Sequence, residues 1–219
     1  MRFIVCGVPR TGTECLAKLL GVFGLKSTHQ QRPEPAEFVQ RFPYELMAPP
    51  PCVREFARLA AYQEGDATAS HSLIWYQAPI QWIRPEVRFL LPLRDPRTVC
   101  SSWLHLDREA RVRKVRLEPE WYAESYRQAY AFALEQARVM PTPPVWYDAR
   151  GMFHGEYLDA LCRYVGGDPA RRQAAWDHLK RPTNHRGSYP LLDDGLFDGC
   201  RKTVEVLKAE LEELTWPTA

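Results

Sequence analysis

The sequence predicts an α/β fold in three layers, with helices on both faces of a central parallel sheet. Short apolar segments rich in β-branched residues alternate along the chain with longer segments of helical periodicity. The predicted strands are continuously apolar, which is typical of parallel strands that are buried on both faces. A chain of 219 residues is long enough for one sizeable core, so we expect a single domain over residues 1–219.

The first strand and the first helix are joined by a short turn that contains two glycines. Residues 2–6 are mostly apolar and β-branched, which predicts a buried strand, and a helix with one apolar face begins at Glu14. The turn between them, residues 7–13, reads GVPRTGT. Backbone N–H groups converge at a helix N-terminus, where the helix dipole is positive. We therefore expect this turn to bind a phosphate group.

The turn differs from the loop of nucleoside triphosphatases at two positions. Gly7 and Gly12 have the G-x-x-x-x-G spacing of that loop, but Thr13 replaces the expected lysine and Glu14 replaces the hydroxyl that binds magnesium. The cation of this turn is Arg10, which lies between the glycines. This pattern argues against hydrolysis of ATP or GTP. The alternative is an ordinary glycine turn, because this spacing alone is common.

The next segment supplies candidate acid/base groups. Residues 24–29 predict a turn and a short second strand, and the prolines in residues 30–35 exclude regular structure there. Residues just past the carboxyl end of a parallel strand face the ligand crevice. His29 and Glu34 are therefore candidates, and the alternative for each is an ordinary surface side chain.

A helix is expected over residues 52–63, and a polar turn over residues 65–71 leads into an aromatic segment. Asp66, Ser70 and His71 in this turn either line the crevice or cap the helix that follows, since serine and aspartate are favoured as N-caps.

A second junction of strand and helix follows the apolar segment 87–93. Asp95 suits the N-cap of the next helix and Pro96 suits its first turn. Arg94 stands at the end of the strand, and Ser102 lies two turns along the helix on roughly the same side. An arginine fork and a hydroxyl together can hold a second phosphate. Taken alone, a capped amphipathic helix explains the same residues.

The remaining elements complete the alternation. The long helix over residues 118–140 carries an aromatic stripe that is expected in the core. The basic run at 108–116 either forms a solvated helix face or attracts an anionic nucleotide. The loop over residues 180–187 concentrates cations and a glycine, which suits closure over an anion. The other predicted elements are a strand at 144–148 and helices at 155–165, 169–179 and 200–214.

Composition narrows the class of protein. The net charge of +2 gives no reason to expect non-specific binding of nucleic acid. No apolar run approaches the roughly 18 residues of a membrane span, and the first strand is too short for a signal-peptide core, so we expect a cytoplasmic protein without a membrane partner. The six cysteines are scattered without a C-x-x-C pair. We expect reduced core thiols and no metal site.

Taken together, the two junctions resemble sulfotransferases that use 3′-phosphoadenosine 5′-phosphosulfate (PAPS). Residues 7–13 resemble the 5′-phosphosulfate loop of that family, G-x-P-R-[ST]-G-T, and Arg94-Asp95-Pro96 with Ser102 is similar to its 3′-phosphate motif. Residues 145–166 resemble a later strand and helix. The resemblance implies a P-loop-like sulfotransferase fold. It also implies metal-independent transfer from PAPS to a hydroxyl or amine of a small-molecule or carbohydrate acceptor, with 3′-phosphoadenosine 5′-phosphate (PAP) as product.

The resemblance also assigns residues to the two ends of the donor. Arg10 would stabilise the charge that develops on the oxygen between phosphorus and the departing sulfuryl group. Arg94 and Ser102 would hold the 3′-phosphate, and Arg186-Gly187 resembles a late Arg/Lys-Gly contact of the family to the same phosphate. The residues assigned to the 5′ end are Pro9, Arg10, Thr11, Gly12, Thr13 and Glu14.

The catalytic base is where the chain departs from the family. Relatives carry a histidine or glutamate near the second strand, but Gln30 occupies the position of the glutamate in the subgroup that this chain resembles. An amide cannot accept a proton, so His29, with an ordinary pKa near 6.5, is the predicted base. The alternatives are Glu34, Asp66 and His71.

Two other classes of function remain open at this point. One is a P-loop kinase for nucleosides or small molecules, against which the missing Lys-Ser/Thr pair counts. The other is a nucleotide-binding protein without catalysis, which Gln30 motivates. Residues 30–86 are expected to form the acceptor side, and nothing in the sequence specifies the acceptor or an oligomeric state.

Overall fold

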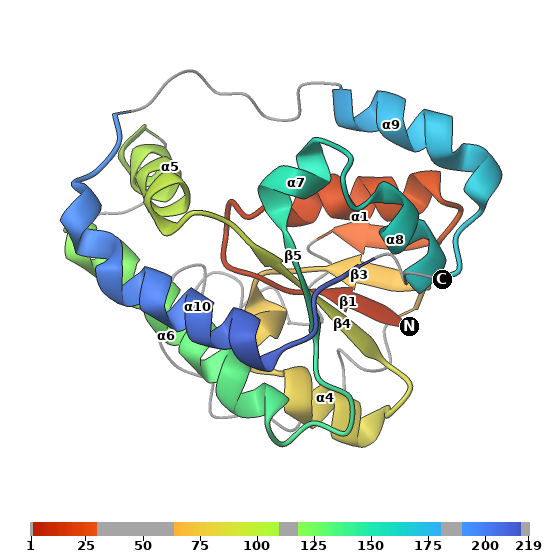
Figure 1. Cartoon of the computed structure of the whole chain (residues 1–219), viewed down its shortest axis with the longest axis horizontal. Coiled ribbons are helices and arrows are strands. Elements are labelled where there is room, and N and C mark those ends of the chain that lie inside the picture. The colour runs from red at the N-terminus through yellow and green to blue at the C-terminus, as the bar shows by residue number, and fades with distance from the viewer. Residues whose placement is uncertain (1, 30–63, 110–117, 181–189, 216–219) are drawn as a thin grey trace.

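The computed structural model describes residues 2–29, 64–109, 118–180 and 190–215, the side chains of Ser72 and residues 106–109 excepted. In this part of the chain, five parallel strands form one sheet in the order β2-β3-β1-β4-β5 (Figure 1). The strands are β1 (Phe3–Val5), β2 (Ser27–His29), β3 (Ala67–Ala69), β4 (Arg88–Leu93) and β5 (Val145–Asp148). The predicted α/β class with a central parallel sheet is thus confirmed.

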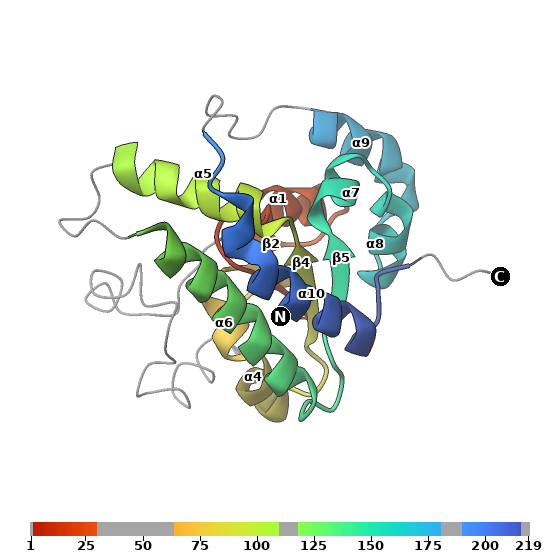
Figure 2. The same cartoon turned by 60° about the vertical axis from the view of Figure 1, so that its left-hand side comes forward.

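Helices cover both faces of the sheet, as the views in Figures 1 and 2 show. One face packs against α4, α5, α6 and α10, and the other against α1, α7, α8 and α9. The α-helices are α1 (Thr13–Val22), α4 (Gln77–Ile83), α5 (Pro96–Glu109), α6 (Pro119–Ala137), α7 (Ala149–Phe153), α8 (Leu158–Tyr164), α9 (Arg172–Lys180) and α10 (Asp198–Glu210). Short 3-10 turns are η1 (Ser72–Trp75), η2 (Pro169–Arg171) and η3 (Asp194–Phe197).

Strand β1 and, beyond Arg88, strand β4 are buried on both sides, as their apolar sequences predict, whereas β2 at the edge of the sheet is half-buried. In β1, Ile4 joins the core under α6, while Phe3 and Val5 join the core under α1. The aromatic stripe of α6 is core, also as predicted: Tyr122, Tyr126 and Tyr130 are fully buried.

One expectation about the sheet is wrong. Residues 67–69 were expected in a polar turn, but they form β3, which lies between β1 and β2. Ala67 pairs with Phe3 on one side and with Ser27 on the other. Three small residues carry almost no local strand signal, and the strand exists because two neighbours supply its hydrogen bonds. The strand divides the expected turn, so that residues 65–66 precede β3 and Ser70 and His71 follow it.

The order of the strands places a topological switch point at the end of β1. The chain runs from β1 through α1 to β2 on one side, whereas it returns through α4 to β4 on the other side. In open α/β sheets, ligands bind outside the carboxyl ends of the strands at such a point. The turn after β1 therefore occupies the position where a ligand is expected.

The boundaries of the later elements differ from prediction in small ways. α7 was not expected, and α6 and α10 are shorter than the predicted ranges of 118–140 and 200–214. The helix predicted over residues 52–63 lies outside the described residues. The described cysteines are free and buried, as predicted: Cys6, Cys15, Cys100, Cys162 and Cys200.

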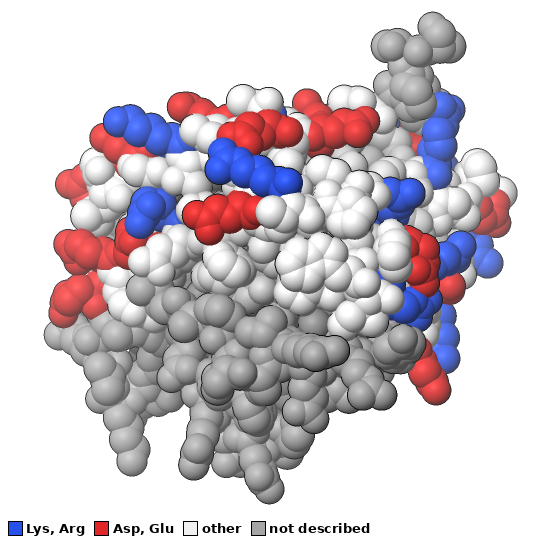
Figure 3. Space-filling model, turned by 90° about the horizontal axis from the view of Figure 1, so that it is seen from below, with Lys and Arg blue, Asp and Glu red and all other residues white. Residues whose placement is uncertain are grey.

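The surface offers two further observations. On the face shown in Figure 3, acidic and basic side chains of the described residues are intermixed. Within the described ranges, none of the helices has the length and apolar character that crossing a membrane requires.

Candidate functional site

The turn between β1 and α1 has an unusual backbone. Arg10 has a φ of 74° and Gly12 a φ of 95°, in the left-handed region that side chains other than glycine disfavour. Gly7 is required by close approach, because a Cβ at this position would lie 2.7 Å from the side chain of Pro92. Backbone strain of this kind persists only where surrounding contacts fix it, and it is concentrated at functional sites.

A hydrogen-bonded cluster joins this turn to the second junction. Arg94 Nη1 donates to the backbone carbonyl of Arg10 at 3.1 Å. Arg10 Nε in turn donates to Ser102 Oγ, also at 3.1 Å. The two guanidinium groups are half-buried and the serine is buried. The two motifs, which lie more than 80 residues apart in sequence, are thus parts of one site.

Buried tyrosines on α6 hold the second junction in place. Tyr126 donates its hydroxyl hydrogen to the Arg94 carbonyl at 2.7 Å, and Tyr130 donates to the Pro92 carbonyl at 2.7 Å. Burial raises the pKa of the Tyr126 phenol well above its ordinary value, so this group stays a neutral donor. The core on the α6 side of the sheet therefore fixes the end of β4, and with it Arg94.

The helix that carries Ser102 begins as its sequence predicts. Pro96 is the first residue of α5, and Asp95 Oδ2 accepts hydrogen bonds from the Thr98 backbone N–H at 2.8 Å and from its hydroxyl at 2.6 Å. The first N–H groups of an α-helix have no acceptor within the helix, and the dipole is positive there. The N-terminus of α5 is satisfied by its own aspartate, whereas that of α1 has no side-chain cap, so the start of α1 and the two arginines favour an anion at this site.

Glu14 is turned away from the interior of the turn. Its Oε1 lies 2.7 Å from Lys18 Nζ, one helical turn further along the exposed side of α1. A carboxylate in the first turn of a helix is stabilised by the dipole. A contribution of Glu14 to a bound anion would therefore come from its backbone N–H and not from its side chain.

His29 lies at the carboxyl end of β2, in register with Ala69 of β3. Its side chain is half-buried, and burial is the main reason that its pKa is lowered from the ordinary value near 6.5. Nearby Glu14 acts in the opposite direction and Lys18 in the same direction, both more weakly. The imidazole is therefore neutral near pH 7, which is the form that accepts a proton.

The other residues expected in the crevice, among them the alternative bases, lie at opposite edges of the sheet. Ser70 and His71 follow the carboxyl end of β3, on the same edge of the sheet as the turn between β1 and α1. Asp66 precedes β3 and therefore lies at the opposite edge, where it accepts hydrogen bonds from Arg2 at 3.1 Å and from the Lys26 backbone N–H at 3.0 Å. The interpretation of Asp66 as a crevice residue is wrong. Glu34, Arg186 and Gly187 lie outside the described residues.

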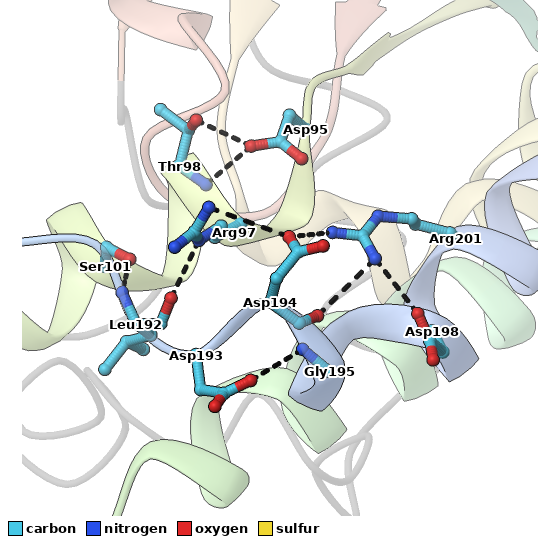
Figure 4. A network of polar contacts seen from close by, with 10 residues as sticks. All are labelled: Asp95, Arg97, Thr98, Ser101, Leu192, Asp193, Asp194, Gly195, Asp198 and Arg201. Carbon is cyan, nitrogen blue, oxygen red and sulfur yellow. Dashed lines mark hydrogen bonds and ion pairs between the residues drawn. The ribbon is translucent and has the colours of Figure 1, made fainter.

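A network of hydrogen bonds and ion pairs, which the sequence did not predict, connects residues 190–195 to α5 (Figure 4). Arg97 Nε donates to the Leu192 carbonyl at 2.7 Å, and the Leu192 N–H donates to Ser101 Oγ at 3.0 Å. Asp194 is paired with Arg97 at 3.8 Å and also with Arg201. The contacts with Arg97 and Ser101 join residues more than 90 positions apart, so no local signal reveals them. They fix the chain beside the residue that precedes Ser102.

A cavity of about 240 Å³ borders the second junction on the side of α10. The cavity is lined by residues at the ends of β4 and β5, at the start of α5 and on α10. Their side chains include charges of both signs. The lining residues are Leu93, Arg94, Asp95, Pro96, Asp148, Arg201, Val204, Glu205 and Lys208. Across the described ranges, no three histidine, cysteine, aspartate or glutamate side chains are grouped closely enough to hold a metal ion.

Comparison with known proteins agrees with the geometry. A family model described as a sulfotransferase domain matches residues 1–164, a range that contains both junctions and β5. A search of curated proteins gave no match.

Proposed function

Because the chain belongs to the sulfotransferase family, we propose that its donor is PAPS and that it transfers the sulfuryl group to a hydroxyl or amine without a metal ion. The acceptor would be a small molecule or a carbohydrate, and PAP would be the second product. Glu14 supports the metal-independent reaction, since it takes the loop position where a magnesium-binding hydroxyl would stand.

The observation that carries the proposal is the hydrogen-bonded cluster of Arg94, Arg10 and Ser102. PAPS carries a phosphosulfate at the 5′ position and a phosphate at the 3′ position of the same ribose, so it needs two anion sites that lie close together. The turn after β1 would bind the 5′ group, and Arg94 with Ser102 would bind the 3′-phosphate. ATP lacks a 3′-phosphate and would be disfavoured.

The chemistry follows from this placement. The acceptor oxygen or nitrogen attacks sulfur, and the bond between sulfur and the bridging oxygen breaks, so negative charge develops on that oxygen. Arg10 and the N–H groups at the start of α1 would stabilise the charge where it appears. One preorganised donor of this kind contributes roughly 3–4 kcal/mol to lowering the barrier.

His29 is the proposed base that receives the proton of the acceptor. It ends β2 on the carboxyl edge of the sheet, and its lowered pKa keeps it neutral at pH 7. Ser70 and His71, which follow the adjacent strand, would lie on the acceptor side.

The test is calorimetric binding of PAP to the wild-type protein and to Arg94→Ala and Arg10→Ala. Charge-assisted hydrogen bonds contribute about 1.5–3 kcal/mol, so Arg94→Ala is expected to weaken PAP binding by roughly 10- to 100-fold. Arg88→Ala is the matched control, because Arg88 is exposed at the other end of the same strand. If the wild type does not bind PAP, or neither variant weakens binding, the donor assignment is wrong. Tight binding of PAP without turnover of any acceptor would instead indicate a nucleotide-binding protein.

A further inference from the structure

Phe153, the last residue of α7, contacts the phosphate-binding turn directly. A Cβ built on Gly12 would lie 2.5 Å from Cζ of the Phe153 ring. The ring tip therefore rests on the backbone of Gly12, immediately before the N-terminus of α1. Phe153 is half-buried and packs against the core on the α1 side of the sheet.

The same ring also contacts the second junction. The guanidinium carbon of Arg94 lies 5.9 Å from the centroid of the Phe153 ring. A cation within about 6 Å of an aromatic face is attracted by the negative charge of that face, more strongly where water is excluded. One side chain thus contacts both anion-binding junctions, although no sequence motif includes it.

The fold holds this ring in place from β5. Asp148, the last residue of β5, pairs in register with Leu93, so α7 begins beside Arg94. The Asp148 carboxylate caps α7 by accepting hydrogen bonds from the backbone N–H groups of Arg150 at 2.7 Å and Gly151 at 3.4 Å. This cap fixes the direction of the single helical turn that ends at Phe153.

We propose that Phe153 is a positioning residue of the donor site, which orients the Arg94 guanidinium for the 3′-phosphate of the nucleotide. The inference rests on the proposed function. Arg94 is then held on two sides, by the ring of Phe153 and by the carbonyl of Arg10. A guanidinium that is ordered before the ligand binds loses less side-chain entropy on binding, which favours affinity.

This role differs from that of an aromatic ring that only stacks on the adenine. A stacking ring would strengthen the binding of every adenine nucleotide equally. A ring that acts through Arg94 would strengthen the binding of nucleotides with a 3′-phosphate and leave the others nearly unchanged. The ratio of the two affinities therefore separates the two roles, and a general loss of structure would not change this ratio.

The experiment measures the dissociation constants of PAP and of AMP, which lacks the 3′-phosphate, for the wild type and for Phe153→Leu. Leucine keeps an apolar side chain but removes the aromatic face. We expect the preference for PAP over AMP to fall by about 3- to 30-fold, which is the range of cation–π contributions. Replacement of Phe153 by 3,5-difluorophenylalanine, which keeps the ring shape and withdraws charge from its face, should shift the preference in the same direction by less.

The matched control is Phe132→Leu, a half-buried phenylalanine that packs on Trp75 on the opposite face of the sheet. It should leave the preference unchanged even where it lowers the melting temperature. An unchanged preference in Phe153→Leu, or an equal loss of affinity for both nucleotides, would overturn the inference while the donor assignment stands. A wild type that does not bind PAP would overturn both.

Discussion

The two junctions that we propose to bind anions are built on different principles. The junction between β1 and α1 depends on backbone shape: two residues have positive φ and two glycines are required by neighbouring atoms. The junction between β4 and α5 has an ordinary backbone with an aspartate cap and a proline, and it depends on the side chains of Arg94 and Ser102. We infer that the backbone shape of the first junction is sensitive to steric changes and that the second junction is sensitive to changes of charge, while Arg10 adds one charged side chain to the first. The difference also separates their proposed roles, because the reacting bond would lie at the first junction.

The largest expected effect is on turnover. Arg10→Ala should lower kcat by about 10²- to 10³-fold, because it removes the donor nearest to the developing charge. Its effect on PAP affinity should be smaller than its effect on kcat, whereas Arg94→Ala should show the reverse. Steady-state kinetics with PAPS, combined with PAP binding, measures both quantities. Equal effects of the two variants on kcat would contradict the division of roles between the junctions.

The next prediction concerns the backbone of the first junction. Gly12→Ala forces a positive φ on alanine and places a methyl group against the Phe153 ring. We expect the free energy of unfolding to fall by roughly 2–4 kcal/mol, measured by chemical denaturation. The control lies in the helix that follows Gly12: a Cβ at Gly21 meets no atom within 4 Å. Gly21→Ala should raise stability by about 0.5–1 kcal/mol, and a similar loss in both variants would contradict the steric argument.

A smaller effect is expected in the pH dependence of activity. Since neutral His29 is the proposed base, kcat/KM should rise with pH and reach its plateau once pH exceeds the pKa of His29, which burial holds below 6.5. The Glu14 carboxylate raises this pKa, so Glu14→Gln should move the midpoint to lower pH. Lys18→Met should move it to higher pH, because the ammonium group lowers the pKa. Profiles that do not move in these opposite directions would indicate a different base.

The sequence predicts those parts of the site that depend on residues close together along the chain. The fold class, the turn at residues 7–13 and the junction at Arg94 follow from local patterns, since a strand end, a helix cap and a glycine spacing are each encoded within a few residues. β3 was missed because Ala67–Ala69 has little apolar surface and depends on its neighbours. The proximity of Arg10 to Ser102 was only partly predicted, from the positions of the two helices.

The contacts that support the site were harder still to predict. Tyr126 was expected in the core, and it is there, but nothing local shows that its hydroxyl reaches the carbonyl of Arg94. Phe153 lies in a helix of five residues that was not expected, because a single turn has too few positions to show a periodicity. Contacts between residues far apart in sequence exist only after the strands have paired.

The smallest expected effect tests this support of the second junction from the core. Tyr126→Phe removes the donor to the Arg94 carbonyl and leaves the rest of the ring in its place beside Tyr130. The free energy of unfolding should fall by about 1–2 kcal/mol, because a part-buried carbonyl loses its partner. PAP affinity should fall by only a few-fold, since the guanidinium of Arg94 keeps its contacts with Arg10 and Phe153. Tyr130→Phe removes the bond to the Pro92 carbonyl and also the contact of this hydroxyl with Thr11 in the first turn, so it should disturb both junctions. A loss of PAP affinity in Tyr126→Phe as large as that in Arg94→Ala would show that Arg10 and Phe153 do not hold the Arg94 guanidinium by themselves.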